Sequence, residues 1–209
     1  MPADGVGRPV LSEAAPIVSG MPTRTATATR YACAELPSPV GPLGVAVTDA
    51  GLVALAFGGA DHADRAARRM PGAAPGPSPA LLDQVRRELR EYFAGDRTAF
   101  EVPVDWRLRT GFARRALVEL HASVGYGETI GYGALAGRLT DPAEPAHDAA
   151  RAVGRAMAGN PVAVVVPCHR VLASTGDLHG FGGGLEAKRR LLALEGVLPR
   201  TFDDLLAFG

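Results

Sequence analysis

Cysteine is scarce in this sequence, with Cys33 and Cys168 as two residues in a chain of 209. Two cysteines cannot build a disulfide framework, and no C-x-x-C or H-x-x-x-H spacing occurs, so we predict free thiols and no metal site. The chain also lacks an apolar run long enough to span a bilayer, and its N-terminus lacks the basic-then-apolar order of a secretory signal. These absences predict a soluble, cytoplasmic protein with no membrane partner.

Net charge is absent as well, because 22 Lys and Arg balance 22 Asp and Glu. A balanced total argues against a nucleic-acid partner, since phosphate binding usually leaves a basic footprint. The distribution reverses that argument. Residues 106–200 carry 12 Lys and Arg against 8 Asp and Glu, whereas the rest of the chain carries 10 against 14. The basic excess therefore lies in the same part of the chain as Cys168.

The first half of the chain predicts a leader and a small domain. Residues 1–30 are rich in Pro, Ala, Gly, Ser and Thr without periodicity, which is typical of a disordered leader. Residues 31–105 predict an α/β domain, with a β-hairpin at 43–57 that is buried on both faces and a linker at 71–79. A helix follows, because Leu82, Val85, Leu89, Tyr92 and Phe93 form one apolar stripe that ends before Gly95.

The second half, residues 106–200, predicts a mainly helical domain, followed by a short tail at 201–209. Apolar periodicity predicts helices at 110–123, 131–139 and 148–160, the last with Asp148 as its N-cap. The last two helices, joined by a turn, indicate a helix-turn-helix. The overall expectation is an α/β (α+β) protein with a small N-terminal α/β domain and a helical C-terminal domain.

The outer face of the predicted helix 148–160 is unusually smooth. Its buried side is expected to contain Ala149, Ala152, Val153, Ala156 and Met157. Arg151 and Arg155 then project from an outer face of small residues, namely Ala150, Gly154 and Ala158. Small side chains allow close approach to another surface, and arginines suit DNA. The alternative is an ordinary solvated helix face.

Cys168 lies in the stretch VVVPCHRV, residues 164–171. The apolar run 162–166 predicts a buried strand that Pro167 ends, so Cys168 is expected at a strand exit, where a thiol can react. Adjacent residues of an extended chain point to opposite sides, so His169 could assist Cys168 only through a water or a bend. Two alternatives remain open: a buried structural cysteine, and a cysteine hydrolase, which usually places its histidine far from the cysteine in sequence.

A family resemblance rests on two segments, RAVGRAMAGNPVAVVVPCHRVLASTGDLHGFGGGLEAKRRLLALEG (151–196) and, more loosely, SPVGPLGVAVTDAGLVALAF (38–57). These resemble the O6-alkylguanine-DNA alkyltransferases, also called methylated-DNA-protein-cysteine methyltransferases. The match is dense from about Phe112 to Gly196, and PCHR in this context is highly specific. The resemblance implies a helix-turn-helix and a buried active-site cysteine in the C-terminal domain. It also implies irreversible, single-turnover DNA repair, in which the alkyl group of O6-alkylguanine, or of O4-alkylthymine, moves to Cys168.

The resemblance implies a catalytic role for four residues. Cys168 matches the alkyl acceptor, and His169 matches the base that reaches it through a water. Glu195 matches the acid that orients the histidine. Asn160 matches the asparagine that braces the turn around the site.

Other positions match residues that contact substrate or DNA in the family. Tyr132 matches the tyrosine that hydrogen-bonds the flipped guanine, and Arg151 the arginine that fills the gap left in the DNA stack. The implied substrate-binding set is Tyr132, Val171, Phe181, Gly182 and Lys188, and the implied DNA-binding set is Arg151, Arg155, Ala150 and Gly154.

The implied partner is double-stranded DNA containing O6-alkylguanine, bound in the minor groove by a monomer that can bind cooperatively, with no cofactor and no metal. Three departures from the family pattern stand out: a longer turn at 140–150, Phe181 in place of a common tyrosine, and Gly182 in place of a common serine. The alternative from another class is a non-catalytic helix-turn-helix protein that recognises damaged DNA. Relatives of that kind replace the acceptor cysteine, which this chain keeps.

Overall fold

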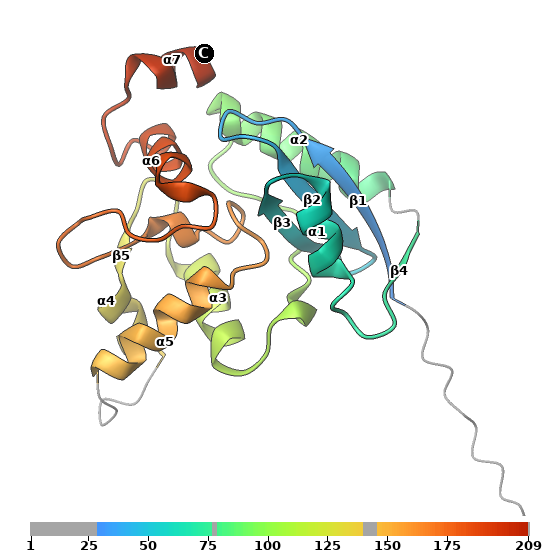
Figure 1. Ribbon diagram of the computed structural model, residues 1–209. Helices are drawn as coiled ribbons and strands as arrows, with labels where there is room; N and C mark the ends of the chain where they lie inside the picture. The colour runs from blue at the N-terminus through green and yellow to red at the C-terminus, as the bar shows by residue number, and fades with distance from the viewer. Residues whose placement is uncertain (1–28, 77–78, 140–145, 209) are drawn as a thin grey trace, which may run out of the picture.

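The computed structural model describes residues 29–76, 79–139 and 146–208 (Figure 1). These residues form two parts that share a main hydrophobic core. The N-terminal part contains β1 (Arg30–Leu36), β2 (Leu43–Thr48), β3 (Gly51–Phe57), α1 (Ala60–Ala67), β4 (Ala74–Pro75) and α2 (Pro79–Ala94). The C-terminal part contains η1 (Trp106–Leu108), α3 (Gly111–Ser123), β5 (Ile130–Gly131), α4 (Tyr132–Gly137), α5 (Ala146–Ala158), η2 (Cys168–Arg170), β6 (Val171–Leu172), α6 (Gly184–Leu194) and α7 (Phe202–Phe208). The predicted fold class, a small α/β part followed by a mainly helical part, is confirmed.

Four strands form one sheet in the order β3-β2-β1-β4. The β2–β3 and β1–β2 pairs are antiparallel, and β4 pairs with β1 in parallel. All of β2 and the first five residues of β3 are buried, which confirms the predicted hairpin with both faces covered. The sheet is therefore an interior layer of the N-terminal part.

The two helices of the N-terminal part cover opposite faces of this sheet (Figure 1). Val45 and Val47 belong to the main core together with apolar residues of α2, whereas Ala46 belongs to a second cluster with Ala63 and Ala67 of α1. This division follows from the period of two along a strand, which sends successive side chains to opposite faces. Helix α1 was not predicted from the sequence.

The outer edge of β3 holds the segment that leads to Cys168. The Leu55 amide donates to the Pro161 carbonyl at 2.8 Å, and the Ala163 amide donates to the Leu55 carbonyl at 2.9 Å. The prediction of a strand at 162–166 is wrong, because β3 offers only this single bridge before the chain turns. The turn closes when the Val166 amide donates to the Val162 carbonyl at 2.9 Å. The predicted burial of the segment is nevertheless correct.

Two boundaries in the N-terminal part differ from the predictions. Ala74 and Pro75, in the predicted linker, form β4 because the Ala74 amide donates to the Thr29 carbonyl at 3.0 Å. Proline has no backbone N–H, and an edge strand tolerates it at a position where an N–H would point away from the sheet. Arg30, assigned to the leader, begins β1. The remainder of the predicted leader, residues 1–28, lies outside the described residues.

The three helices predicted in the C-terminal part are present as α3, α4 and α5, which pack against one another. Val153, Ala156 and Met157 of α5 are buried as predicted, whereas Ala152 is half-buried. Asp148 is not the N-cap, because α5 begins two residues earlier at Ala146 and places Asp148 in its first turn. Most of the longer turn at 140–150 lies outside the described residues.

The predicted tail contains helix α7, which docks on α6. The Arg189 guanidinium pairs with the buried Asp204 carboxylate, with Nη2 and Oδ1 2.7 Å apart, and the Thr201 amide donates to Asp204 Oδ2 at 2.7 Å. No helix in the described ranges is both long and apolar enough to cross a membrane.

Candidate active site

The turn before Cys168 is strained and is held by Asn160. Val164 adopts φ 70°, a left-handed conformation that costs a β-branched residue about 1–3 kcal/mol. The Asn160 side chain bridges the turn, because its Oδ1 accepts from the Val162 amide at 3.0 Å and its Nδ2 donates to the Val166 carbonyl at 2.8 Å. Together with the edge of β3, these bonds fix the position at which Cys168 follows.

The Cys168 thiol is buried, with 7% of the residue exposed. Asn160 Nδ2 also donates to Cys168 Sγ at 3.2 Å, so one amide contacts both the turn and the sulfur. Burial raises the pKa of the Cys168 thiol, although the Asn160 hydrogen bond and the positive charge of Lys188 act in the opposite direction. Cys168 is therefore a neutral thiol at rest, and it needs a base to become nucleophilic.

Residues 168–170 form the 3-10 helix η2 and not the extended chain that the sequence suggested. This bend turns both His169 and Arg170 into the interior, where each is buried. His169 Nε2 lies 2.9 Å from Glu195 Oε1. The structure thus brings residues from three separate segments into two hydrogen-bonded pairs, Asn160 with Cys168 and Glu195 with His169, which the adjacent positions 168 and 169 connect.

Glu195 is an ionised carboxylate in the interior. Burial alone would raise the pKa of Glu195, but the hydrogen bonds from His169 and Arg170 and the positive charge of Arg170 act against it, and the pKa is lowered to about 2. Arg170 makes a two-point contact, with Nε 2.8 Å from Oε2 and Nη2 2.9 Å from Oε1. Its third nitrogen, Nη1, donates to the Val124 carbonyl at 2.7 Å, so each nitrogen of the buried guanidinium has a hydrogen-bond acceptor.

His169 is neutral and has one free ring nitrogen. Burial lowers the pKa of His169 even though Glu195 acts to raise it. With Nε2 facing a carboxylate, the proton of the neutral ring lies on Nε2 and donates to Glu195. The Nδ1 atom is buried and has no hydrogen-bond partner among the described residues. Its lone pair is available to accept a proton.

The predicted substrate-binding residues lie around this group. Lys188 is buried, and its Nζ donates to the Val171 carbonyl at 2.8 Å, while burial lowers its pKa. Tyr132 begins α4, which β5 positions through its pairing with β6. Burial and then the neighbouring Cys168 raise the pKa of Tyr132, so the phenol stays protonated near the thiol.

The glycine-rich loop before α6 contributes Phe181 and Gly182. The Phe181 ring meets the His169 ring edge to face, with centroids 6.4 Å apart, and meets Phe57 of β3 at 5.3 Å. A Cβ atom at Gly182 would have no heavy atom within 4 Å. Phe181 therefore forms an aromatic wall beside the histidine, and the position of Gly182 is open.

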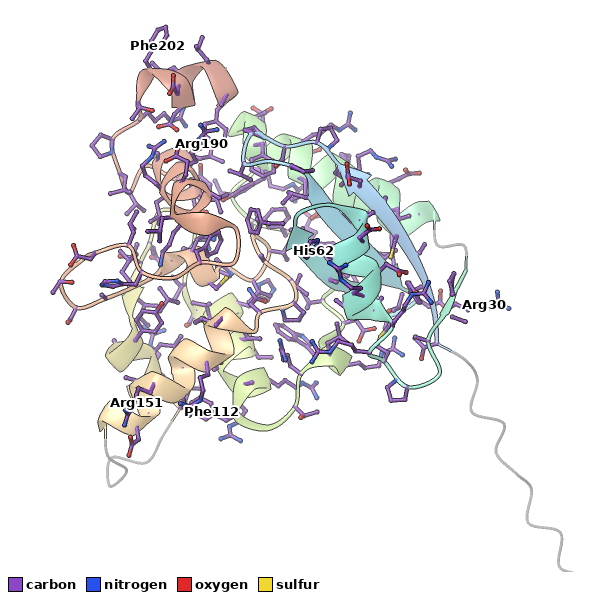
Figure 2. The ribbon with its side chains drawn as sticks, viewed as in Figure 1. Arg30, His62, Phe112, Arg151, Arg190 and Phe202 are labelled. Carbon is purple, nitrogen blue, oxygen red and sulfur yellow. The ribbon has the colours of Figure 1, made fainter. Side chains whose placement is uncertain are left out.

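The predicted DNA-contact residues lie on the outer side of α5. Arg151 and Arg155 are exposed and Ala150 and Gly154 are half-buried. Figure 2 shows Arg151 on the half of α5 that lies away from the sheet, and its Nη2 donates to Asp148 Oδ1 at 2.8 Å. The Gly154 Cβ position lies 4.0 Å from the Tyr132 ring, so this helix face adjoins the Cys168 site.

Sequence reasoning missed two residues of the site, Arg170 and Tyr92. Tyr92 Oη donates to Glu195 Oε1 at 2.6 Å, across 103 residues of sequence. Arg170 carried a signal, because it continues a buried segment and needs a buried acid as partner. Tyr92 carried none, because an aromatic residue on an apolar helix stripe predicts only packing. No cluster of three or more His, Cys, Asp or Glu that could hold a metal occurs within the described ranges.

Comparison with protein families gives two adjacent matches. Residues 30–106 match "6-O-methylguanine DNA methyltransferase, ribonuclease-like domain", and residues 112–197 match "6-O-methylguanine DNA methyltransferase, DNA binding domain". A methylated-DNA--protein-cysteine methyltransferase of Mycobacterium tuberculosis is 44% identical over 119 residues, 57% of this chain and 68% of the relative. The protein of that name from Methanopyrus kandleri is 40% identical over 129 residues, 61% of this chain and 91% of the relative.

Solved structures agree with these matches. The crystal structure of Mycobacterium tuberculosis OGT in complex with DNA superimposes with a TM-score of 0.65 at 35% identity, covering 86% of this chain and 99% of that one. The O6-methylguanine-DNA methyltransferase of Pyrococcus kodakaraensis gives a TM-score of 0.56 at 26% identity, covering 80% and 99%. With both family models matched in order around the buried Cys168 site, the chain belongs to the 6-O-methylguanine DNA methyltransferase family.

Proposed function

We propose that this protein repairs DNA by moving the alkyl group of O6-alkylguanine onto the sulfur of Cys168, in a single irreversible turnover. The observation that carries the proposal is the buried thiol held by Asn160 beside the neutral His169 and the ionised Glu195. Relatives named methylated-DNA--protein-cysteine methyltransferase, and a structure of one family member with DNA, support it.

In the proposed reaction, His169 Nδ1 takes the thiol proton of Cys168 through a bridging water. Glu195 stabilises the imidazolium that forms, because its carboxylate is already ionised. The sulfur attacks the alkyl carbon, a carbon–sulfur bond forms, and the carbon–oxygen bond breaks with its electron pair on guanine. A hydrogen bond from the Tyr132 phenol stabilises the charge on the leaving guanine. The guanine anion then takes up one proton and the imidazolium of His169 gives one up through water, so that neutral guanine and neutral His169 result. The thioether has no good leaving group, so each protein molecule reacts once. O4-alkylthymine presents the same bond and is a second substrate of this chemistry.

In the proposed DNA complex, α4 and α5 act as a helix-turn-helix whose smooth outer face enters the minor groove. The damaged base lies inside the duplex, so it must be flipped out at a cost of about a few kcal/mol, and Arg151 fills the vacancy. Phe181, Gly182, the Val171 backbone and Lys188 surround the flipped base. The closeness of Gly154 to Tyr132, whose ring lies 4.0 Å from where a Cβ of residue 154 would be, supports this arrangement, because it places the α5 face beside the Cys168 site.

Intact mass spectrometry tests the proposal. After incubation with a duplex containing O6-methylguanine, the protein should gain the mass of one methyl group, and peptide mapping should place it on Cys168. An unmodified duplex is the control. Binding of the damaged duplex without any gain in mass would contradict the proposal and favour the alternative, a non-catalytic protein that recognises damaged DNA.

A further inference from the structure

The side chain of Tyr92, in the N-terminal part, reaches the buried Glu195 of the Cys168 site. Tyr92, on α2, is fully buried, and its ring packs against Phe100 at 5.2 Å and Tyr126 at 6.1 Å between centroids. Its hydroxyl donates to Glu195 Oε1 at 2.6 Å. The packed ring fixes where this hydroxyl points, so the donor is preorganised.

The oxygen that Tyr92 contacts is the one that faces His169. Glu195 Oε1 accepts from Tyr92, His169 and Arg170, whereas Oε2 accepts from Arg170 Nε. The two-point contact with Arg170 holds the carboxylate from the side of η2. The Tyr92 hydroxyl holds the same carboxylate from a second direction, that of α2, at the oxygen that faces the histidine, and so limits its rotation away from His169.

We infer that Tyr92 is a positioning residue for the alkyl-transfer reaction: its hydroxyl orients the Glu195 carboxylate, and through it the His169 ring, toward Cys168. This inference rests on the proposed function. It assigns to the N-terminal part a contribution to the reaction that acts through Glu195, beyond support of the C-terminal helices.

The first test is the rate of methyl transfer by Tyr92→Phe, which removes one oxygen atom and keeps the packed ring. With an O6-methylguanine duplex and excess protein, we expect a single-turnover rate constant roughly tenfold below wild type, about the value of one hydrogen bond. Affinity for the unmodified duplex should not change, because Tyr92 is buried away from solvent.

Tyr31→Phe is the matched control. Tyr31 is also fully buried and also donates to a carboxylate, Asp64 Oδ1 at 2.8 Å, but it belongs to the second cluster beside α1. It should lose stability as Tyr92→Phe does and still transfer methyl at the wild-type rate. An equal loss of rate in both variants would overturn the inference, since it would show a general effect of a lost buried hydrogen bond.

A double-mutant cycle tests whether Tyr92 affects the rate of methyl transfer through His169. In a His169→Ala background, Tyr92→Phe should cause no further loss of rate, because the residue through which it acts is already absent. A structural role for Tyr92 would slow both backgrounds alike. Equal losses in the two backgrounds would therefore overturn the inference.

The pH dependence of the rate provides a third readout. Among the described residues, the titratable groups that act on the histidine–glutamate pair are Tyr92 of α2, Tyr126, Arg170 and Lys188 of α6. Loss of the Tyr92 donor leaves more negative charge on Glu195, which stabilises the imidazolium. The acid limb of the rate profile should therefore move to higher pH in Tyr92→Phe.

These measurements separate the inference from the proposed function. Absence of methyl transfer by the wild-type protein would refute the proposed function itself. Transfer by Tyr92→Phe at the wild-type rate, with an unmoved pH profile, would refute the positioning role and leave the proposed function intact.

Discussion

The thiol of Cys168 is protonated in the resting protein. Burial raises its pKa more than the Asn160 hydrogen bond and the charge of Lys188 lower it. Its partner His169 is neutral and keeps Nδ1 free, while Nε2 donates to Glu195. Neither residue is reactive by itself. In the proposed reaction, reactivity arises when a water connects the two and the proton moves to the histidine.

We expect Cys168→Ser to abolish methyl transfer, because a hydroxyl in this site gives up its proton far less readily than a thiol and is a weaker nucleophile. Binding to the unmodified duplex should persist, since the buried sulfur contacts no phosphate. Mass spectrometry and a binding titration measure the two effects. Cys33→Ser is the matched control and should react as wild type, because Cys33 lies in β1. Measurable transfer by Cys168→Ser would contradict the mechanism.

At the scale of elements, α5 carries two arginines in different settings. Arg151 pairs with Asp148, but both side chains are mostly exposed, at 61% and 67%, so the pair contributes at most about 1 kcal/mol and opens easily when DNA binds. Arg155 lies one turn later on the same face. The two positions are therefore suited to separate roles on DNA.

We expect Arg151→Ala to slow repair of a duplex substrate strongly and repair of a single strand only slightly, because a residue that fills a vacated stack matters only where a stack exists. Arg155→Ala should weaken binding of all duplexes alike and reduce the salt dependence by about one unit, as a phosphate contact does. Rates on both substrates and binding at several salt concentrations measure this. An equal loss of rate on duplex and single strand for Arg151→Ala would leave Arg151 only an electrostatic role.

The loop before α6 packs tightly against β3 at one glycine and not at its neighbour. A Cβ at Gly183 would lie 2.7 Å from ring atoms of Phe57, whereas a Cβ at Gly182 would contact nothing. We expect Gly183→Ala to destabilise the fold by about 1–3 kcal/mol, the usual cost of overpacking, and to slow transfer by displacing Phe181. Gly182→Ala should melt at the wild-type temperature. Equal Tm values for the two variants would show that the Phe57 ring moves freely.

At the scale of the whole molecule, the buried ion pair of Glu195 and Arg170 is one source of the pH dependence of stability. The pKa of Glu195 is about 2 in the folded protein against an ordinary value of 4.5, which corresponds to about 3 kcal/mol of stability. The folded-state pKa is depressed, so this stability is present above about pH 4.5 and is lost as the pH falls toward 2. Glu195→Gln removes it and also leaves Arg170 without its buried acid.

The free-energy difference between wild type and Glu195→Gln should therefore shrink as the pH falls from about 6 to about 3, measured by urea unfolding. Glu186→Gln is the matched control, because its pKa is also lowered to about 2 by Arg189 and Arg190 but its side chain is 60% exposed. Water and salt screen the ion pairs of Glu186. The difference in the free energy of unfolding between wild type and Glu186→Gln should therefore be small and should decrease with added salt. If the difference in the free energy of unfolding between wild type and Glu195→Gln stayed constant with pH, the Glu195 carboxylate would not be ionised in the folded protein.

The two parts of the molecule are joined by backbone and side-chain bonds that converge on the site. The edge of β3 holds the turn before Cys168 through Leu55, and α2 contributes Tyr92 to Glu195. The main core includes residues of both parts. The N-terminal part is therefore a structural neighbour of the reactive centre, although the sequence predicted no chemistry for it.

The sequence by itself determined the local features. The periodicity of residues 148–160 predicted the buried side and the smooth outer side of α5, and the PCHR stretch identified Cys168 and His169 as candidates. The family resemblance added Asn160 and Glu195, which the structure places in hydrogen-bonded contact with Cys168 and His169, respectively. These features depend on residues close in sequence or on a motif of fixed spacing, so they can be read without a fold.

Only the tertiary structure decided how distant segments meet. Residues 162–166 have the composition of a strand, but β3 provides a single bridge, so they turn. Tyr92 resembles any core aromatic until the fold brings its hydroxyl to Glu195 across 103 residues. The physical reason is the same in both cases: hydrogen bonds in a buried site are made with whichever group packing brings within reach, and that choice is not encoded in the neighbouring sequence.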